Sequence, residues 1–351
     1  MSGNNGRPSR RHLAVALVLV AFAAMACTPT TGGGGGGGPA TTWSVDPATA
    51  DPATTADALN PNLAYLPVTT ERGALAVVLH GTGAGTGGFT EITSALRRDG
   101  YHVIVLRYSA SVGTVAACPD TGAATFPDCH RVLRSETTFG AGVADPDGHS
   151  YDHPVANIAL ADSVMNRLLK LLDHLHSVAP DAGWDQFQAR SSGSCVDTNP
   201  TYGACEADWS KVALLGHSQG AGVALYMASF VPLRAAGLLS GSFDAYLTGP
   251  GTAAAAPWTT ETGFATPASA IRTLRHVSDG GDERILAVAD AVGVSGPEVS
   301  AETAPFASNR LLATTTPTCP WDSAQGHNST AVDLCAPDWV YWDAWRLLAG
   351  S

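Results

Sequence analysis

The pattern Gly-x-Ser-x-Gly at residues 216–220 places a serine between two glycines, and its flanks predict that this serine is a nucleophile. The apolar run at 212–215 is typical of a buried strand that ends directly at Gly216, and the small residues after Gly220 favour a helix packed closely on a sheet. A serine on such a sharp strand-to-helix turn is exposed at the top of the sheet, and its neighbours two residues away must lack a Cβ atom. We therefore identify Ser218 as the candidate reacting hydroxyl.

A serine hydroxyl is a weak nucleophile until a base takes its proton, so the chain must also supply a histidine and an acid that orients it. Where these groups follow in the order Ser, Asp, His, the acid lies after a later strand and the histidine on a loop near the end of the chain. The stretch 273–277 predicts a strand leading to Asp279, which is our candidate acid. Asp282 lies in the same turn and stays open as the alternative, although the helix expected directly after it would also suit a capping role.

His327 is the candidate base. It follows the predicted acid along the chain and lies in a loop between Cys319 and Cys335, which a disulfide would hold in place. The other late histidine, His276, falls within the strand expected before Asp279, so the pleat of that strand would direct its side chain. The loop histidine is therefore the preferred base.

The tetrahedral intermediate of acyl transfer needs hydrogen-bond donors aimed at its oxyanion. The backbone N–H of Gln219, directly after the serine, is one candidate. The stretch 77–85, Val-Val-Leu-His-Gly-Thr-Gly-Ala-Gly, is typical of an early strand that ends in such a loop, and it offers Thr82 as the second donor, with Gly83 next. His80 in this stretch is expected to be a structural residue beneath the loop.

These groups must be positioned by a regular framework. Apolar runs predict strands at 74–79, 103–108, 212–215 and 273–277, and helical periodicity predicts helices at 89–98, 157–176, 222–230 and 285–292. Alternating strands and helices imply an α/β fold, with a mostly parallel central sheet covered by helices on both faces.

Two long insertions interrupt this framework, at 109–154 and at 240–267. Both are rich in Gly, Ala and Thr and are expected to form loops beside the strand ends, where they could cover a binding pocket. The acidic stretch 145–152 lacks the later acidic ligand of a calcium loop, so it predicts a solvated turn, and we predict no metal site.

The first 62 residues predict export. Residues 1–27 combine a basic start, an apolar run too short to span a bilayer comfortably and small residues before Cys27. This segment resembles a bacterial lipoprotein signal, in which Cys27 becomes lipidated; an ordinary secretory signal and a twin-arginine signal stay open. Residues 28–62, with a glycine run at 32–38, predict a flexible linker to a globular domain at 63–351. The expected location is extracytoplasmic, secreted or anchored through Cys27.

The six remaining cysteines fall into three close pairs. Exported proteins oxidise their thiols, and no pair has the Cys-x-x-Cys spacing that zinc sites favour. The simplest expectation is three disulfides between near neighbours: Cys118 with Cys129, Cys195 with Cys205, and Cys319 with Cys335.

The composition narrows the class of partner. Only 14% of residues are charged and the formal net charge is -12, which argues against nucleic acid as a partner. Residues 83–88 also fit the Gly-x-Gly-x-x-Gly pattern of dinucleotide-binding proteins, but the next expected strand ends in Arg107 and Tyr108 instead of an acidic residue. We therefore predict no cofactor.

The combination of the Gly-His-Ser-Gln-Gly elbow, the His80-Gly81 turn and the late histidine loop resembles the α/β-hydrolase superfamily, in particular serine esterases and lipases. This resemblance covers residues 63–351 and implies an eight-stranded, mostly parallel sheet and hydrolysis of a small-molecule or lipid ester through an acyl-enzyme. The long insertions depart from the family pattern and leave the substrate class open, and the sequence does not indicate an oligomeric state.

Two other functions stay open. The same acyl-enzyme could pass its acyl group to an alcohol or a sugar, which would make the protein an acyltransferase. Alternatively, the protein could be a binding lipoprotein that keeps the fold without the chemistry, although the presence of Ser218, Asp279 and His327 in chain order speaks against this.

Overall fold

The computed structural model describes residues 41–55, 57, 59–261, 263–294, 296–306, 309–316, 326–336 and 339–351. The predicted export signal (1–27) and the linker up to residue 40 lie outside the described residues. Residues 41–62, which the sequence assigns to the same linker, instead belong to the folded unit, because two strands of the central sheet begin there. Within the described ranges, no helix combines the length and the apolar character needed to cross a membrane.

A nine-stranded sheet forms the centre of the protein, with the strand order β1-β2-β4-β3-β9-β10-β13-β15-β14. The seven strands from β4 to β14 are parallel, and β2 and β1 are antiparallel at one edge. The strands are β1 (Thr42–Val45), β2 (Asn62–Tyr65), β3 (Leu75–Leu79), β4 (His102–Leu106), β9 (Val212–His217), β10 (Ala235–Leu239), β13 (Ile271–His276), β14 (Val299–Ser300) and β15 (Leu311–Thr314). The predicted α/β class with a mostly parallel sheet is thus confirmed.

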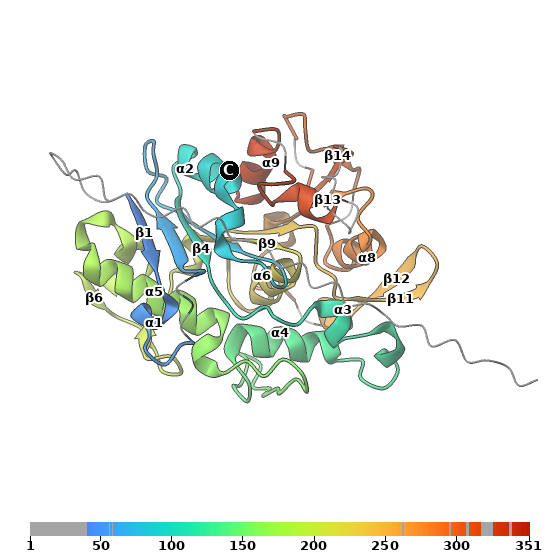
Figure 1. Cartoon of the computed structure of the whole chain (residues 1–351), viewed down its shortest axis with the longest axis horizontal. Helices are drawn as coiled ribbons and strands as arrows, with labels where there is room; N and C mark the ends of the chain where they lie inside the picture. The colour runs from blue at the N-terminus through green and yellow to red at the C-terminus, as the bar shows by residue number, and fades with distance from the viewer. Residues whose placement is uncertain are drawn as a thin grey trace, which may run out of the picture. The chain divides into compact units, whose positions relative to one another are not determined.

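Helices cover both faces of this sheet, as Figure 1 shows, with α2 and α9 on one face and α5 and α6 on the other. The helices are α1 (Pro47–Ala50), α2 (Thr90–Arg98), α3 (Thr114–Ala117), α4 (Cys129–Phe139), α5 (Val164–Val178), α6 (Gln219–Phe230), α7 (Trp258–Glu261), α8 (Asp282–Ala291) and α9 (Trp342–Leu348). Short strands form three separate pairs: β5 (Arg190–Ser191) with β6 (Ser194–Cys195), β7 (Thr198–Asn199) with β8 (Ala204–Cys205), and β11 (Ala245–Gly249) with β12 (Thr252–Ala255).

Two hydrophobic cores result from the alternation of side chains along each strand. In β3, Leu75, Val77 and Leu79 pack into the core that contains α5, α6 and α8, whereas Ala76 and Val78 pack into the core that contains α2 and α9. Because both faces of a parallel strand are buried, β3 is apolar along its whole length, which is why the sequence predicts it so readily.

The longest predicted helix begins later than expected. The pattern predicts a helix over 157–176, but α5 begins at Val164. Asn157 has a φ of 50°, which is outside the helical region, and Ser163 caps the helix by accepting a hydrogen bond from the N–H of Asn166 at 3.3 Å. Of the apolar residues before this cap, Ile158 is buried outside any helix, and Leu160 lies in a short 3-10 helix (Leu160–Asp162).

The insertion at 109–154 contains α3 and α4, although the sequence predicts loops there. Helix α4 is almost completely buried despite its polar composition. Its Glu136 accepts a hydrogen bond from the N–H of Ile158 at 2.6 Å, and its Arg134 is paired internally. A helix that buries paired polar side chains lacks an apolar stripe, so periodicity does not reveal it. The second insertion contains the β11–β12 hairpin.

Two of the three predicted cysteine pairs lie at bonding distance. The sulfur atoms of Cys118 and Cys129 are 2.03 Å apart, and those of Cys195 and Cys205 are also bonded. These disulfides are compatible with an extracytoplasmic protein. The predicted pair with Cys335 lies outside the described residues, because Cys319 is not among them.

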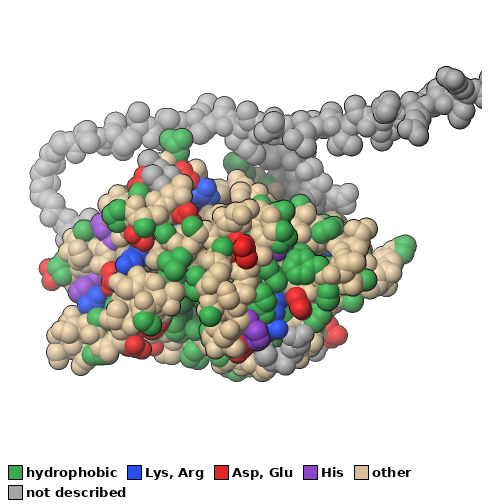
Figure 2. Space-filling model, turned by 90° about the horizontal axis from the view of Figure 1, so that it is seen from below, with side chains coloured by type: hydrophobic (Ala, Val, Ile, Leu, Met, Phe, Trp, Pro, Cys, Tyr) green, Lys and Arg blue, Asp and Glu red, His purple; other side chains and the backbone are tan. Residues whose placement is uncertain are grey.

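Charged side chains are sparse on the surface. On the face drawn in Figure 2, acidic and basic groups are scattered among apolar and uncharged ones. This distribution agrees with the low charged fraction of the sequence, 14%.

The packing of α9 against the sheet gives a first prediction. Trp345 is fully buried and donates a hydrogen bond from its indole N–H to the carbonyl of Thr330 at 2.9 Å, whereas Trp339 is 71% exposed. We expect Trp345→Ala to lower the free energy of unfolding by about 3–5 kcal/mol, because it leaves a large cavity. The matched variant Trp339→Ala should change it by less than about 0.5 kcal/mol. Urea unfolding of both variants checks this, and equal losses would contradict the packing.

Candidate active site

Ser218 occupies a strained turn between β9 and α6. Its φ is 57° and its ψ is −116°, a backbone conformation that residues other than glycine rarely adopt. A Cβ atom at Gly216 would lie 2.0 Å from the carbonyl oxygen of Gly220, and one at Gly220 would lie 2.5 Å from that of Leu79. Only glycines therefore allow the strand, the turn and the helix to approach so closely.

The predicted base and acid are hydrogen bonded to each other. Nδ1 of His327 lies 2.8 Å from Oδ2 of Asp279, whose side chain is only 1% exposed. The other carboxylate oxygen accepts the N–H of Gly281 at 2.9 Å. Because a carboxylate only accepts hydrogen bonds, Nδ1 carries the proton and Nε2 is left to act as the acceptor.

A hydrogen bond connects the loop that carries His327 to the turn that carries Ser218, through the residue before the serine. Nε2 of His217 donates a hydrogen bond to the carbonyl oxygen of His327 at 3.1 Å, and the two rings lie 5.0 Å apart. Burial lowers the pKa of His217 to about 3, so this ring is neutral and donates from one nitrogen. Since His217 directly precedes Ser218, this hydrogen bond connects the loop that carries His327 to the turn that carries the serine.

An aromatic ring supports the other side of the histidine. Phe243 stacks on His327 with a centroid distance of 5.1 Å and an interplanar angle of 20°. Phe243 follows β10 and lies close to Gly281, where an added Cβ would overlap its ring. The ring of His327 therefore contacts the rings of both His217 and Phe243.

The alternative acid and base lie elsewhere. Asp282 pairs with Arg275, whose Nη1 lies 2.5 Å from Oδ1 of the aspartate. Nε2 of His276 donates a hydrogen bond to the carbonyl of Thr316 at 2.6 Å, and its Nδ1 accepts the N–H of Ser278. The geometry therefore favours Asp279 over Asp282 and the loop histidine over His276.

The predicted oxyanion loop lies against the nucleophile. A Cβ atom on Gly81 would lie 3.1 Å from Cβ of Ser218, so the loop after β3 touches the serine directly. The hydroxyl of Thr82 donates to Oε1 of Gln219 at 2.8 Å, which brings the two predicted donor residues together. Gly83 already donates its N–H to the carbonyl of Ala110 at 2.9 Å, so it is not available for an oxyanion.

His80 lies beneath this loop, as expected for a structural residue. It is fully buried, Nδ1 donates to the carbonyl of Gly81 at 2.8 Å, and Nε2 lies 3.2 Å from Nη1 of Arg107. Burial lowers its pKa to about 4, so the ring is neutral and accepts from the guanidinium.

The topology of the sheet places these groups at the carboxyl ends of its strands. The chain leaves β3 through α2 to reach β4 on one side, whereas it leaves β9 through α6 to reach β10 on the other side. Crevices for ligands form where connections diverge in this way, outside the carboxyl ends of the strands. The loop with Thr82 and the turn with Ser218 follow these two strands.

A cavity of about 350 Å³ opens beside the base and the acid. Its walls come from α3, from the segment after β10, from the β11–β12 hairpin and from the start of α8. It is lined by Val115, Phe243, Leu247, Asp279, Gly280, Gly281, Arg284 and His327. The two insertions thus supply part of the wall of this cavity, as the sequence predicts for loops beside the strand ends.

One group of side chains has the composition of a metal site. Cys118, Cys129 and His153 are buried together, and Nε2 of His153 lies 3.3 Å from the sulfur of Cys129. Both sulfurs lie at bonding distance from each other, and a disulfide cannot supply thiolate ligands. This group therefore gives no reason to place a metal here.

Sequence reasoning missed the residues that hold the site together. His217, Phe243 and the buried Arg134 have no motif of their own, because each acts through contacts with distant parts of the chain. The position of His217 inside the five-residue pattern is the only signal that could have drawn attention to it.

Comparison with known proteins assigns this chain to no family. No family model matches the chain, and no curated protein is significantly similar to it.

Two of the buried histidines, His80 and His217, give a prediction for pH. The ordinary histidine pKa is 6.5, and burial lowers the values of His80 and His217 to about 4 and about 3. The unfolded chain therefore binds these protons at higher pH than the folded protein does. We expect the free energy of unfolding to be largest above pH 6.5 and to fall below it, by about 1.4 kcal/mol per pH unit for each histidine.

The measurement is an NMR titration of the ring signals combined with urea unfolding at several pH values. Both rings should keep the shifts of neutral imidazole from pH 8 to pH 5, and His80→Asn and His217→Asn assign the signals. A midpoint near pH 6.5 for either ring would contradict the burial of that ring.

Proposed function

We propose that this protein is a serine hydrolase that acts on carboxylic esters through Ser218, His327 and Asp279. The observation that carries the proposal is the chain of hydrogen bonds from Asp279 through the ring of His327, and from the carbonyl of His327 to His217, the neighbour of Ser218. This arrangement has the three parts that activate a hydroxyl: a strained and presented serine, a base, and a buried acid that orients the base.

In the proposed mechanism, Oγ of Ser218 attacks the ester carbonyl while Nε2 of His327 takes the hydroxyl proton. Asp279 keeps the proton on Nδ1 and stabilises the imidazolium that forms. The N–H groups of Gln219 and Thr82 stabilise the oxyanion. The protonated ring then gives its proton to the leaving alcohol, and the acyl group stays on the serine until water, activated by the same ring, releases it.

The sheet supports assignment to the α/β-hydrolase fold. The serine follows the central strand β9, the acid follows β13, and the base follows β15, so all three lie at carboxyl ends of strands. The order Ser218, Asp279, His327 is that of the family. The sheet has nine described strands where the resemblance implies eight, but β14 contributes only two residues.

The cavity favours an apolar acyl group of modest size. Val115, Phe243 and Leu247 give it apolar walls, and the base and the acid lie at its edge. Its volume of about 350 Å³ is near the lower end for small-molecule sites. We propose that the natural substrate is a small-molecule or lipid ester that the protein meets outside the cytoplasm, with a membrane contact only through a lipid on Cys27.

The triad gives the central prediction. Ser218→Ala and His327→Ala should each remove nearly all turnover of p-nitrophenyl butyrate, because the nucleophile or its base is lost. Asp279→Asn should lower kcat by about 10⁴-fold, because the amide no longer fixes the proton on Nδ1. The matched variant Asp282→Asn should leave kcat within about threefold, since Asp282 pairs with Arg275.

A fluorophosphonate probe distinguishes catalysis from binding alone. Folded wild-type protein should be labelled, and Ser218→Ala should not be. If the folded protein is not labelled and has no esterase activity, the protein is a binder and the proposal is wrong. Products formed in the presence of competing alcohols separate a hydrolase from an acyltransferase.

The cavity gives a prediction on chain length. Leu247 is 42% exposed and forms one wall, so Leu247→Trp should narrow the cavity. We expect kcat/KM to fall about tenfold or more for p-nitrophenyl hexanoate and to change little for the acetate, because each methylene that loses its contact weakens binding. Leu247→Ala is the matched control and should not discriminate against hexanoate. Equal losses on both esters for Leu247→Trp would show that the acyl chain binds elsewhere.

A further inference from the structure

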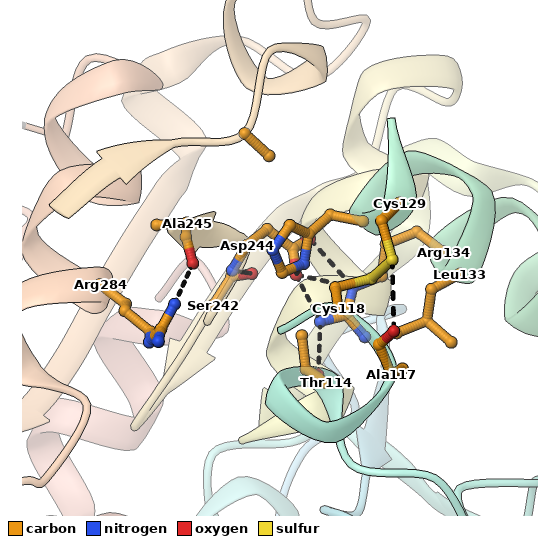
Figure 3. Close-up of polar contacts among 12 residues, drawn as sticks. Thr114, Ala117, Cys118, Cys129, Leu133, Arg134, Ser242, Asp244, Ala245 and Arg284 are labelled. Atoms are coloured by element: carbon orange, nitrogen blue, oxygen red, sulfur yellow. Dashed lines mark hydrogen bonds and ion pairs between the residues drawn. A yellow bond between two sulfur atoms is a disulfide. The ribbon is translucent and has the colours of Figure 1, made fainter. Parts of the chain in front are cut away.

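A completely buried ion pair lies behind the first turn of α6. The guanidinium of Arg134, on α4, donates from Nε to Oδ2 of Asp244 at 2.9 Å and from Nη2 to Oδ1 at 2.5 Å. Neither side chain has any exposed surface. Burial alone would raise the pKa of Asp244, but the charge of Arg134 and the nearby His130 outweigh it and hold the pKa below its ordinary value. Figure 3 shows this pair between α4 and the segment that follows β10.

The same guanidinium also contacts the proposed active site. Nη1 of Arg134 donates to the carbonyl oxygen of Gln219 at 3.2 Å. Nη2 donates to the hydroxyl of Thr114 at 3.0 Å, as Figure 3 shows. Gln219 is the residue that follows the nucleophile and offers its N–H to the oxyanion. A Cβ atom at Gly222 would lie 2.3 Å from the guanidinium carbon, so a glycine in the first turn of α6 makes room for the arginine.

A cation at this position is electrostatically unfavourable for the fold. The N-terminus of a helix carries positive partial charge, which favours anions and disfavours a guanidinium. Burying an ion pair also removes two charges from water, so the pair is weak evidence for a role in stability. A local conflict of this kind is expected where function requires it.

The acid of the pair is adjacent to the ring that supports the histidine. Phe243 precedes Asp244, stacks on His327 and lies against Gly281. Because the carboxylate of Asp244 is anchored on Arg134, the backbone that carries Phe243 is anchored as well. The guanidinium of Arg134 therefore contacts Gln219, a proposed oxyanion donor, directly. It is linked to His327, the proposed base, through Asp244 and Phe243.

We propose that Arg134, held by Asp244, is a positioning residue for the reaction. It fixes the backbone of Gln219 so that its N–H faces the developing oxyanion, and through Asp244 and Phe243 it fixes the ring of His327. This inference rests on the proposed ester hydrolysis. Since the oxyanion exists only beyond the ground state, losing the anchor should affect kcat much more than KM.

The test uses two variants of the full-length protein. Arg134→Lys keeps the charge but loses the fork that bridges Asp244 and Gln219. The double variant Arg134→Met/Asp244→Asn removes both buried charges together, so that no unpaired ion remains. Activity on p-nitrophenyl butyrate should show kcat lowered at least about tenfold in the double variant, with KM within about twofold, because small displacements of catalytic groups are costly. Arg134→Lys should give an intermediate kcat.

A second ion pair, whose aspartate side chain is 17% exposed, provides the control. Nη2 of Arg167 lies 2.6 Å from Oδ1 of Asp162, and the arginine side chain is 5% exposed, but neither residue contacts the proposed catalytic groups. The double variant Arg167→Met/Asp162→Asn should keep kcat within about threefold of wild type. Urea unfolding and circular dichroism establish that each variant is folded.

The outcomes separate this inference from the function on which it rests. If wild-type protein neither hydrolyses the ester nor reacts with a fluorophosphonate, the proposed function is wrong and the positioning role falls with it. If the wild type is active and the folded Arg134 variants keep its kcat, or change only KM, the positioning role alone is wrong. If neither Arg134 variant folds while the control does, Arg134 is a structural residue and the inference is overturned.

Discussion

The close approach of helix α6 to the sheet is the constraint on which the rest of the structure depends. Gly216 and Gly220 let the strand, the turn and the helix meet at distances that no side chain would permit, and Gly222 makes room for a guanidinium on the outer side of the same turn. Because the first turn of α6 is enclosed in this way, Ser218 keeps a conformation that its own backbone preferences disfavour. The strained conformation therefore lies at the residue that we propose as the nucleophile.

Neutral and charged side chains both lie near Ser218, the proposed nucleophile. The two histidines closest to β3 and β9, His80 and His217, are buried and neutral, so they act as fixed hydrogen-bond partners. Nearby, Asp279 is hydrogen bonded to His327, Asp244 is paired with Arg134, and Arg284 is paired with Asp120. Of these side chains, Asp279, His327 and Arg284 line the cavity, and His327 is the proposed base.

The sequence predicts the local part of this site well and the remote part poorly. The sharp turn at Ser218 is predicted correctly because it needs glycines at fixed positions, and the strands at 74–79 and 103–108 are found because both of their faces are buried. Strand β10 (Ala235–Leu239) is missed because its alanines and glycine have no strand preference. The pairing of Arg134 with Asp244 joins residues 110 positions apart, and no local pattern encodes such a contact.

Hydrogen bonds connect the two insertions to each other and to α8. Asp120, in the loop closed by the Cys118–Cys129 disulfide, accepts hydrogen bonds from the N–H of Leu247 and from the side chain of Arg284, both at 2.7 Å. The first insertion, with Asp120, is therefore hydrogen bonded to the second insertion, with Leu247, and to α8, with Arg284. Their conformational entropy is lost during folding, so under the proposed function the walls of the cavity would be preorganised and substrate binding would not need to order them.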